Sequence, residues 1–219
     1  MKIGTDGVLL GAWTSVDSKP NSILDMGAGT GVISLQMAQR TQAETIDAIE
    51  IDELAHEQCT SNFESSPWGD RLFCYHASVQ EYASEIEETY DLIISNPPFY
   101  SEDYKTADTA RDLARFADAL PFQHLLVCAA HLLAETGVFS VILPKKEEAA
   151  FILLAETVSL FPKRICRVRG TATAVVKRSL IEFSFEQNTP IEEELTIEIS
   201  RHEYTEAYKN LVSDFYLKM

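Results

Sequence analysis

Short apolar runs rich in β-branched residues alternate along this chain with segments of helical periodicity, and this alternation restricts the fold more than any other feature. Strands that are joined by helices run parallel, because each helix returns the chain to the same edge of the sheet. The predicted strands of this kind are residues 22–26, 45–51, 72–76, 90–95 and 138–143. The sequence therefore predicts an α/β domain with a parallel sheet.

Helical segments separate these strands, with apolar residues recurring every three or four positions. The predicted helices are residues 31–40, 53–65, 122–133 and 145–161. Gly137 stands in the position of a helix stop after the third of them.

The last third of the chain breaks the alternation. Only a loop separates residues 164–169 from residues 180–185, so these two runs are predicted to pair antiparallel. Residues 195–199 resemble a strand, and an amphipathic helix is predicted near residues 204–217. No linker or composition shift divides the sequence, so we predict a single domain over residues 1–219.

The charge balance is strongly acidic. Eighteen Lys+Arg face 34 Asp+Glu, which gives a formal net charge of −16. This balance excludes a protein coated in positive charge, such as a histone-like nucleic-acid binder, but it leaves room for a local basic patch. Hydrophobic residues make up 46% of the chain and charged residues 24%, which is the mix of a globular domain and not of a disordered chain.

Four widely spaced cysteines form no Cys-x-x-Cys pair, and the five histidines show no metal-ligand spacing. The start of the chain has no apolar leader, and no apolar run approaches the roughly 20 residues that span a bilayer. We therefore expect a cytoplasmic protein with free thiols, without a bound metal and without a membrane partner.

A glycine-rich loop follows the first predicted strand, where Asp25 precedes Gly27, Gly29 and Gly31. Glycines at alternate positions let the backbone turn sharply and let a ligand approach the peptide plane. A dinucleotide-binding loop has a different glycine spacing and holds a pyrophosphate, which a carboxylate at this place would repel. Asp25 instead suits a phosphate-free ligand with positive charge. S-adenosyl-L-methionine, with its ammonium and sulfonium groups, is such a ligand.

Two residues at the end of the second predicted strand support this interpretation. Glu50 follows Asp25 at close to the spacing at which an acid accepts both ribose hydroxyls of a nucleoside. Ile51 is then placed to cover one face of the adenine. A tight turn and a helix cap at Asp52 would explain the same residues without a ligand. The order of the two features along the chain favours S-adenosyl-L-methionine.

The fourth predicted strand runs directly into Asn96, Pro97, Pro98 and Phe99. Neither proline has an N–H to donate, so carbonyls point outward without competing donors at the edge where open α/β sheets bind ligands. Asn96 offers a side-chain acceptor and Pro97 a main-chain acceptor, which together can orient the N–H groups of an exocyclic amine. Phe99 offers a flat face on which a flipped-out base can stack. A rigid proline loop without function is the alternative.

These motifs resemble those of the class I S-adenosylmethionine-dependent amino-methyltransferases. Further segments are similar to the bacterial valine-tRNA adenine N6-methyltransferase family, namely residues 2–13, 66–68, 91–98, 204–208 and 215–217. The resemblance implies a Rossmann-like fold with a seven-stranded, mostly parallel sheet, a C-terminal antiparallel strand pair and helices on both faces. It also implies methylation at N6 of adenine 37, immediately 3′ of the anticodon in valine tRNA.

The resemblance assigns further residues to the cofactor. Thr5, Asp6 and Leu10 would flank its methionine end, although a plain turn or helix cap is the alternative for the start of this segment. Family members carry an acid after the third strand that contacts the adenine amine, and Ser78 takes its place here as a weaker hydrogen-bonding partner. Asn96 would contact the cofactor as well as the amine. Relatives also carry an N-terminal arm ahead of the segment that matches Met1, and we expect this arm to be missing.

Basic residues gather in two parts of this acidic chain. One group lies in the long loop beyond Phe99, and the other falls in a stretch of the last strand pair that contains no acid. The predicted RNA-binding residues are Arg111, Arg115, Lys163, Arg164, Arg167, Lys177 and Arg178. A solvated strand pair with edge-protecting charges is the alternative.

Other functions remain open from the residues. The same tetrapeptide could orient a glutamine side-chain amide of a protein, or N2 of guanine in ribosomal RNA. A non-catalytic scaffold that binds the cofactor or RNA is a third alternative, against which Asp25, Glu50 and Asn96 count. Phe99, in place of the tyrosine common in glutamine methylators, favours a nucleobase. We expect a monomer whose partner is tRNA.

Overall fold

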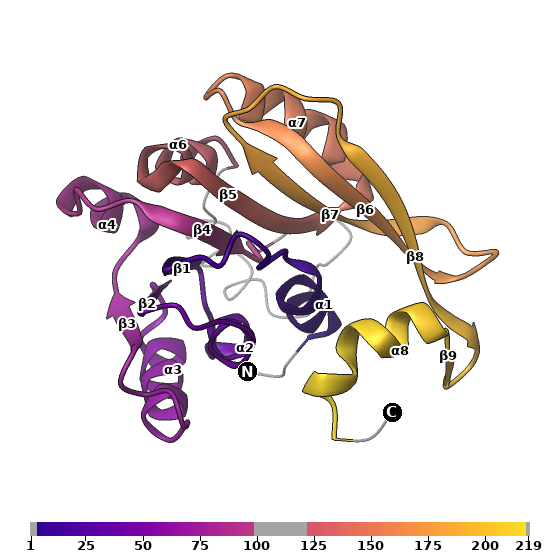
Figure 1. The fold of residues 1–219 in the computed structure, drawn as a ribbon, viewed down its shortest axis with the longest axis horizontal. Helices are drawn as coiled ribbons and strands as arrows, with labels where there is room; N and C mark the ends of the chain where they lie inside the picture. Colours follow the sequence, from indigo (N-terminus) through magenta and orange to yellow (C-terminus); the bar gives the residue numbers. More distant parts are fainter. Residues whose placement is uncertain (1–3, 99–121, 218–219) are drawn as a thin grey trace, which may run out of the picture.

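The computed structural model describes residues 4–98 and 122–217. Within these residues, nine strands form one sheet in the spatial order β3-β2-β1-β4-β5-β7-β6-β8-β9 (Figure 1). The strands are β1 (Ser22–Met26), β2 (Thr45–Glu50), β3 (Leu72–His76), β4 (Tyr90–Ser95), β5 (Leu133–Pro144), β6 (Phe161–Thr171), β7 (Val176–Ser184), β8 (Ile191–Ser200) and β9 (Glu203–Tyr204). The α/β class and the five strands predicted to run parallel are confirmed.

The strands from β3 to β5 are all parallel to their neighbours. In their register, Met26 lies opposite both Ile49 and Ser95, and Glu50 lies opposite His76. The carboxyl ends of β1, β2, β3 and β4 therefore meet at one side of the sheet, which we call the carboxyl edge. Ligands of open α/β sheets bind outside this edge.

Four strands extend the sheet beyond β5. β7 is antiparallel to both β5 and β6, which confirms the predicted antiparallel pair. β8 is added parallel to β6, and β9 pairs antiparallel with β8. The described sheet thus has two strands more than the seven that the resemblance implies. The start of β8 contains an acidic run, whose exposed side chains do not prevent the backbone from pairing.

Helices cover both faces of the sheet, as expected (Figure 1). One face carries α1 (Thr5–Trp13), α2 (Val32–Arg40), α3 (Glu53–Glu64) and α8 (Glu206–Val212). The other carries α4 (Val79–Glu85), α6 (Phe122–Leu132) and α7 (Glu148–Glu156). Two short 3₁₀ helices span Lys145–Glu147 and Ser213–Phe215. Among the described residues, no helix is long and apolar enough to pass through a membrane.

Two predicted helix boundaries are wrong. α6 ends at Leu132, and Gly137 lies within β5 instead of stopping the helix. The helix predicted for residues 145–161 is replaced by a 3₁₀ turn and the nine-residue α7. α7 ends early because the backbone N–H of Leu160 donates to the carbonyl of Ala155 at 3.0 Å, and the chain then enters β6.

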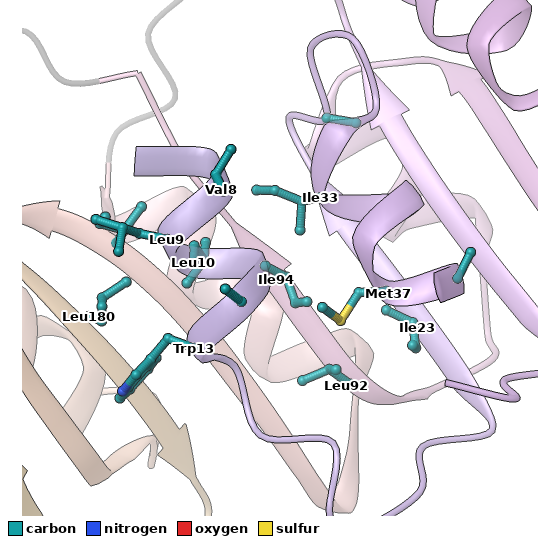
Figure 2. Packing of buried hydrophobic residues seen from close by; sticks show 14 of the residues in the cluster. Val8, Leu9, Leu10, Trp13, Ile23, Ile33, Met37, Leu92, Ile94 and Leu180 are labelled. Atoms are coloured by element: carbon teal, nitrogen blue, oxygen red, sulfur yellow. The ribbon is translucent and has the colours of Figure 1, made fainter. Parts of the chain in front are cut away.

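Helix α1 was not among the predicted helices; a turn or helix cap was considered only for the start of this segment. All its residues from Gly7 to Trp13 are buried, and Figure 2 shows Leu10 and Trp13 among the side chains of the core. Gly7 and Gly11 lie one turn apart on the side of α1 that faces α2. A Cβ at Gly11 would lie 2.2 Å from Oε1 of Gln36. The glycines therefore let the two helices approach closely instead of breaking α1.

Candidate active site

The glycine loop connects β1 to α2 at the carboxyl edge. Gly27, Gly29 and Gly31 have φ angles of 78°, 57° and 79°, which lie in the left-handed region that favours glycine. The backbone N–H groups of Gly27 and Ala28 donate to the carbonyl of Ile49 at 2.9 and 3.0 Å. The loop therefore folds over the end of β2, and its backbone requires the alternating glycines.

Gly31 and Gly27 face different surroundings. A Cβ at Gly31 would lie 2.5 Å from Cε1 of Phe63 and 2.8 Å from Sγ of Cys59, so this glycine packs the loop against α3. A Cβ at Gly27 would meet no described atom within 4 Å. The backbone at Gly27 is thus open to a ligand, as a cofactor-binding loop requires.

Asp25 lies in β1 directly before this loop and is 1% exposed. Its Oδ2 accepts two hydrogen bonds from Ser34 of α2, whereas its Oδ1 is buried without a partner among the described residues. Burial raises the pKa of Asp25 to about 7, against the opposing effect of the hydrogen bonds from Ser34. An unpartnered buried carboxylate oxygen fits an ammonium group, whose charge would favour the ionised acid.

Ser34 was not predicted as a site residue. The available signal was a serine at the first turn of α2, where the helical pattern calls for an apolar residue because the position faces the sheet. Ser34 is fully buried, so its hydroxyl must find a partner inside the protein, and Asp25 provides it.

Glu50 holds the loop from the side of β2. Its Oε2 accepts from the N–H of Gly29 at 2.7 Å, and its Oε1 accepts from the N–H of Asp52 at 2.8 Å. Each oxygen keeps capacity for a further hydrogen bond, which a ribose hydroxyl can supply. Ile51 is 53% exposed, so its apolar surface is free to cover an adenine. Asp52 also caps α3 by accepting from the N–H of Ala55, so the two explanations of this segment are compatible.

Ser78 is engaged in the structure as a helix cap. Its hydroxyl donates to Oε2 of Glu81 at 2.7 Å and accepts from the N–H of Glu81 at 3.2 Å. The backbone N–H of Ser78 donates to the same carboxylate, which completes a capping box for α4. A hydrogen bond from Ser78 to an adenine amine would have to compete with these contacts.

Asn96 emerges from β4 next to the glycine loop. The hydroxyl of Ser95 donates to the carbonyl of Met26 at 2.8 Å and fixes the end of β4 beside β1. Nδ2 of Asn96 lies 3.8 Å from the position that a Cβ would take on Gly7. The structure therefore brings Asn96, the glycine loop and the first turn of α1 together at the carboxyl edge.

The rest of the tetrapeptide is partly described. Pro97 is buried and Pro98 is exposed. Phe99, predicted to stack on a base, lies outside the described residues, as do Arg111 and Arg115, predicted to bind RNA.

Residues of α1 that were assigned to the cofactor have different surroundings. Leu10 is fully buried in the hydrophobic core, and its assignment to the cofactor stays a prediction. Thr5 is exposed at the start of the helix. Asp6 accepts a hydrogen bond from Nε of Arg178 on β7 at 2.8 Å.

The predicted basic patch does not exist as a set of free cations. Arg164 forms an ion pair with Glu182 at 3.0 Å, and its guanidinium stacks over the ring of Trp13 at 3.9 Å from the ring centre. Arg167 pairs with the buried Glu148 at 3.0 Å. Both carboxylates lie outside the stretch without acids, and the fold brings them to the arginines.

Lys163 and Lys177 are exposed and form no ion pair with a described residue. The register separates them along the sheet. Lys163 follows Pro162, which lies opposite Phe183, near the start of β6 and the end of β7. Lys177 precedes Arg178, which lies opposite Pro144 at the carboxyl end of β5. Lys177 is therefore at the carboxyl edge, and Lys163 is not.

In the described residues, no group of three or more His, Cys, Asp or Glu side chains is arranged to hold a metal ion. The four cysteines are all free, and Cys59, Cys128 and Cys166 are buried.

Comparison with known proteins places the chain in a family. The sequence model of the methyltransferase small domain matches residues 7–160. Proteins named tRNA1(Val) (adenine(37)-N6)-methyltransferase match the whole chain. The protein of Christiangramia forsetii is 59% identical over 92% of its own length. The protein of Flavobacterium johnsoniae is 59% identical over 94% of its own length. A relative of that name in Bacteroides fragilis is 41% identical, again over the whole chain and 92% of its own length. The chain belongs to this methyltransferase family.

Solved structures agree with a methyltransferase fold. A protein of Agrobacterium tumefaciens described as a predicted O-methyltransferase has a TM-score of 0.74 at 19% identity, with 95% of this chain and 96% of that chain covered. The ribosomal protein L11 methylase of Lactobacillus delbrueckii has a TM-score of 0.58 at 12% identity, covering 83% and 77%. At these identities the likeness concerns the fold alone.

Proposed function

We propose that this chain transfers the methyl group of S-adenosyl-L-methionine to N6 of adenine 37 in valine tRNA and leaves S-adenosyl-L-homocysteine as the second product. The observation that carries the proposal is the full-length match, at 59% identity, to proteins named for this reaction. The geometry is consistent with it, because Asp25, Glu50 and Asn96 all lie at the carboxyl edge.

The residues around the glycine loop match the needs of S-adenosyl-L-methionine, which when bound supplies an electrophilic methyl group on its sulfonium. Oδ1 of Asp25 is the buried acceptor for the ammonium group. Glu50 accepts the ribose hydroxyls while it holds Gly29. The open space above Gly27 admits the ligand to the backbone, and Ile51 covers the adenine.

The acceptor amine is a poor nucleophile because its lone pair is delocalised into the adenine ring, and Asn96 and Pro97 are placed to orient it. The side-chain oxygen of Asn96 and the carbonyl of Pro97 accept its two N–H groups and turn the lone pair toward the methyl carbon. The N–C bond forms as the C–S bond breaks, the C–S electron pair stays on sulfur, and a proton of the amine passes to solvent. Positioning and fixed dipoles provide the acceleration, without a strong base.

The flipped adenine stacks on Phe99 in this proposal, which remains a prediction from the sequence. We also propose that the chain acts on tRNA as a monomer in the cytoplasm, where its four free cysteines would stay reduced. Neither glutamine nor guanine N2 appears in the names of the relatives quoted above, which favours adenine over those two alternatives.

The test is to incubate the protein with methyl-labelled S-adenosyl-L-methionine and, separately, with total tRNA, ribosomal subunits and a release factor. Nuclease digestion of the tRNA should release the label as N6-methyladenosine. A valine tRNA transcript with guanine at position 37 is the matched control and should remain unlabelled. Label on a glutamine of the release factor, or on guanine of ribosomal RNA, would overturn the proposal.

A further inference from the structure

The two ends of helix α1 are held in different ways. At its C-terminal end, Arg40 donates to the carbonyls of Gly11 and Thr14 at 2.6 and 2.8 Å, and Arg164 donates to the carbonyl of Trp13 at 2.7 Å. The first turn has no side-chain cap at Gly4. Among the described residues, Arg178 alone forms an ion pair with this turn.

The first turn is also the part of α1 that lies at the candidate active site. Gly7 is the residue of α1 whose Cβ position would lie 3.8 Å from Nδ2 of Asn96 and 3.4 Å from Cγ1 of Val32, the first residue after the glycine loop. A shift of this turn would therefore change the space between Asn96 and the loop. Asp6, adjacent to Gly7, is the residue that Arg178 holds.

Arg178 reaches Asp6 from the same edge of the sheet. It lies opposite Pro144 at the carboxyl end of β5 and opposite Val168 on β6. The next residue of β7, Ser179, is fully buried and bonded to the buried Glu148. Arg178 thus extends from a fixed part of the sheet, while Asp6 belongs to the less restrained end of α1.

We propose that the Asp6–Arg178 ion pair positions the first turn of α1 against Asn96 and thereby maintains the cofactor site, which makes Arg178 a positioning residue. The inference rests on the proposed function for the identity of the cofactor. The pair is accessible but not solvated on all sides, with side chains 28% and 34% exposed. If it opens, the fraction of molecules with a competent site falls, and the apparent dissociation constant rises in the same proportion.

This role differs from a contact between Arg178 and an RNA phosphate. A phosphate contact would need Arg178 but not Asp6, whose negative charge would oppose RNA. A positioning pair needs both residues. Replacement of Asp6 by Asn therefore separates the two roles, because it should impair a positioned turn and should not impair, or should even favour, contact with RNA.

The experiment compares D6N, R178Q and the double variant D6N/R178Q, with R178K as the conservative variant. R169Q is the control, because it removes another half-exposed arginine–carboxylate pair, with Glu194, on the neighbouring strands. Calorimetry measures the dissociation constant for S-adenosyl-L-homocysteine, and hydrogen exchange is followed in the peptide that contains residues 4–13. Neither readout needs RNA or turnover.

We expect D6N and R178Q each to raise the dissociation constant about fivefold, within the range of a partly exposed ion pair, and to accelerate exchange in the first turn. The dissociation constant of the double variant should not exceed that of the single variant with the larger loss of affinity. All three variants remove the same interaction. The dissociation constants of R178K and R169Q should stay within about twofold of that of the parent.

Unchanged affinity and exchange in D6N would overturn the proposal, as would fully additive losses in the double variant. Failure of the proposed function has a different signature. The parent would then not bind S-adenosyl-L-homocysteine at all, and no difference in affinity between the variants could be measured. The exchange comparison would still decide whether the pair orders the first turn.

Discussion

Ser34 donates both its backbone N–H and its hydroxyl to the same oxygen of Asp25, at 3.2 and 2.7 Å from Oδ2. The two bonds fix the carboxylate and leave Oδ1 buried without a partner in the described part of the chain. An unsatisfied buried acceptor costs about 1–3 kcal/mol. A cationic ligand that reaches Oδ1 would recover this free energy on binding, so we expect Ser34 to contribute to affinity without touching the ligand.

Replacement of Asp25 by Asn should weaken the binding of S-adenosyl-L-homocysteine by at least about tenfold, because the amide loses a charge-assisted hydrogen bond to the ammonium group. Titration calorimetry at pH 7.5 measures the change. The matched control is Asp47→Asn, which alters another buried acid, one that accepts from Tyr90 at 2.6 Å on β2. Equal loss of affinity in both variants would show that general destabilisation is the cause.

The stability of the fold should depend on pH through Asp25. Burial raises its pKa to about 7 in the folded protein from the ordinary 3.8, so between these values the folded state binds the extra proton. The contribution is therefore fully present below about pH 4 and is lost as the pH rises through 7. The free energy of unfolding of the parent, relative to Asp25→Asn, should fall by about 2 kcal/mol between pH 5 and 7. Urea denaturation at several pH values tests this, and a difference that stays constant with pH would contradict it.

Replacement of Asn96 by Ala should lower kcat by roughly 100-fold or more, because one of the two acceptors that orient the amine is removed. The dissociation constant for S-adenosyl-L-homocysteine should change only a few-fold. Single-turnover methylation of tRNA and calorimetry give the two values. Asn21→Ala is the control, since Asn21 is exposed just before β1, at the opposite end of that strand from the glycine loop. A loss of cofactor affinity as large as the loss of kcat would assign Asn96 to cofactor binding instead.

Local patterns predicted the part of the fold that positions the site. β1 was predicted to its observed bounds, because an apolar run followed by glycines at alternate positions permits little else. α1 was not predicted, and the role of Gly7 and Gly11, close contact with α2, depends on residues outside the segment. A sequence pattern does not encode such a contact between distant residues.

The ion pairs of the basic residues also depend on contacts that a sequence pattern does not encode. Arg164 and Arg167 lie in a stretch without acids, so counting the charges of their sequence neighbours predicts that they are unpaired. The fold places Glu182 of β7 opposite Arg164 and brings Glu148 of α7 and Glu192 of β8 to Arg167. Asp25 and Glu50 were placed correctly at the ends of β1 and β2, because their positions depend only on where two successive strands end.

Replacement of Arg164 by Gln should lower the free energy of unfolding by roughly 2–4 kcal/mol, because it leaves the carboxylate of Glu182 buried without a counter-charge. It also removes the stacking contact with Trp13. Urea denaturation measures the change. Lys163→Gln, one residue away and exposed, should stay within about 0.5 kcal/mol of the parent. If both variants were equally stable, Arg164 would be a surface charge available to RNA.

Within the described part of the chain, Lys177 is the best candidate for contact with a tRNA phosphate, since it is exposed, forms no ion pair there and lies at the carboxyl edge. Lys177→Gln should weaken tRNA binding and reduce the slope of log K against log salt by about 1, because one counterion fewer is released. Lys163→Gln removes the same charge near the start of β6, on the side of the sheet opposite the carboxyl edge, and should leave the slope unchanged. Filter binding of tRNA at several salt concentrations compares the two variants. Equal slopes would mean that the RNA reaches Asn96 without passing Lys177.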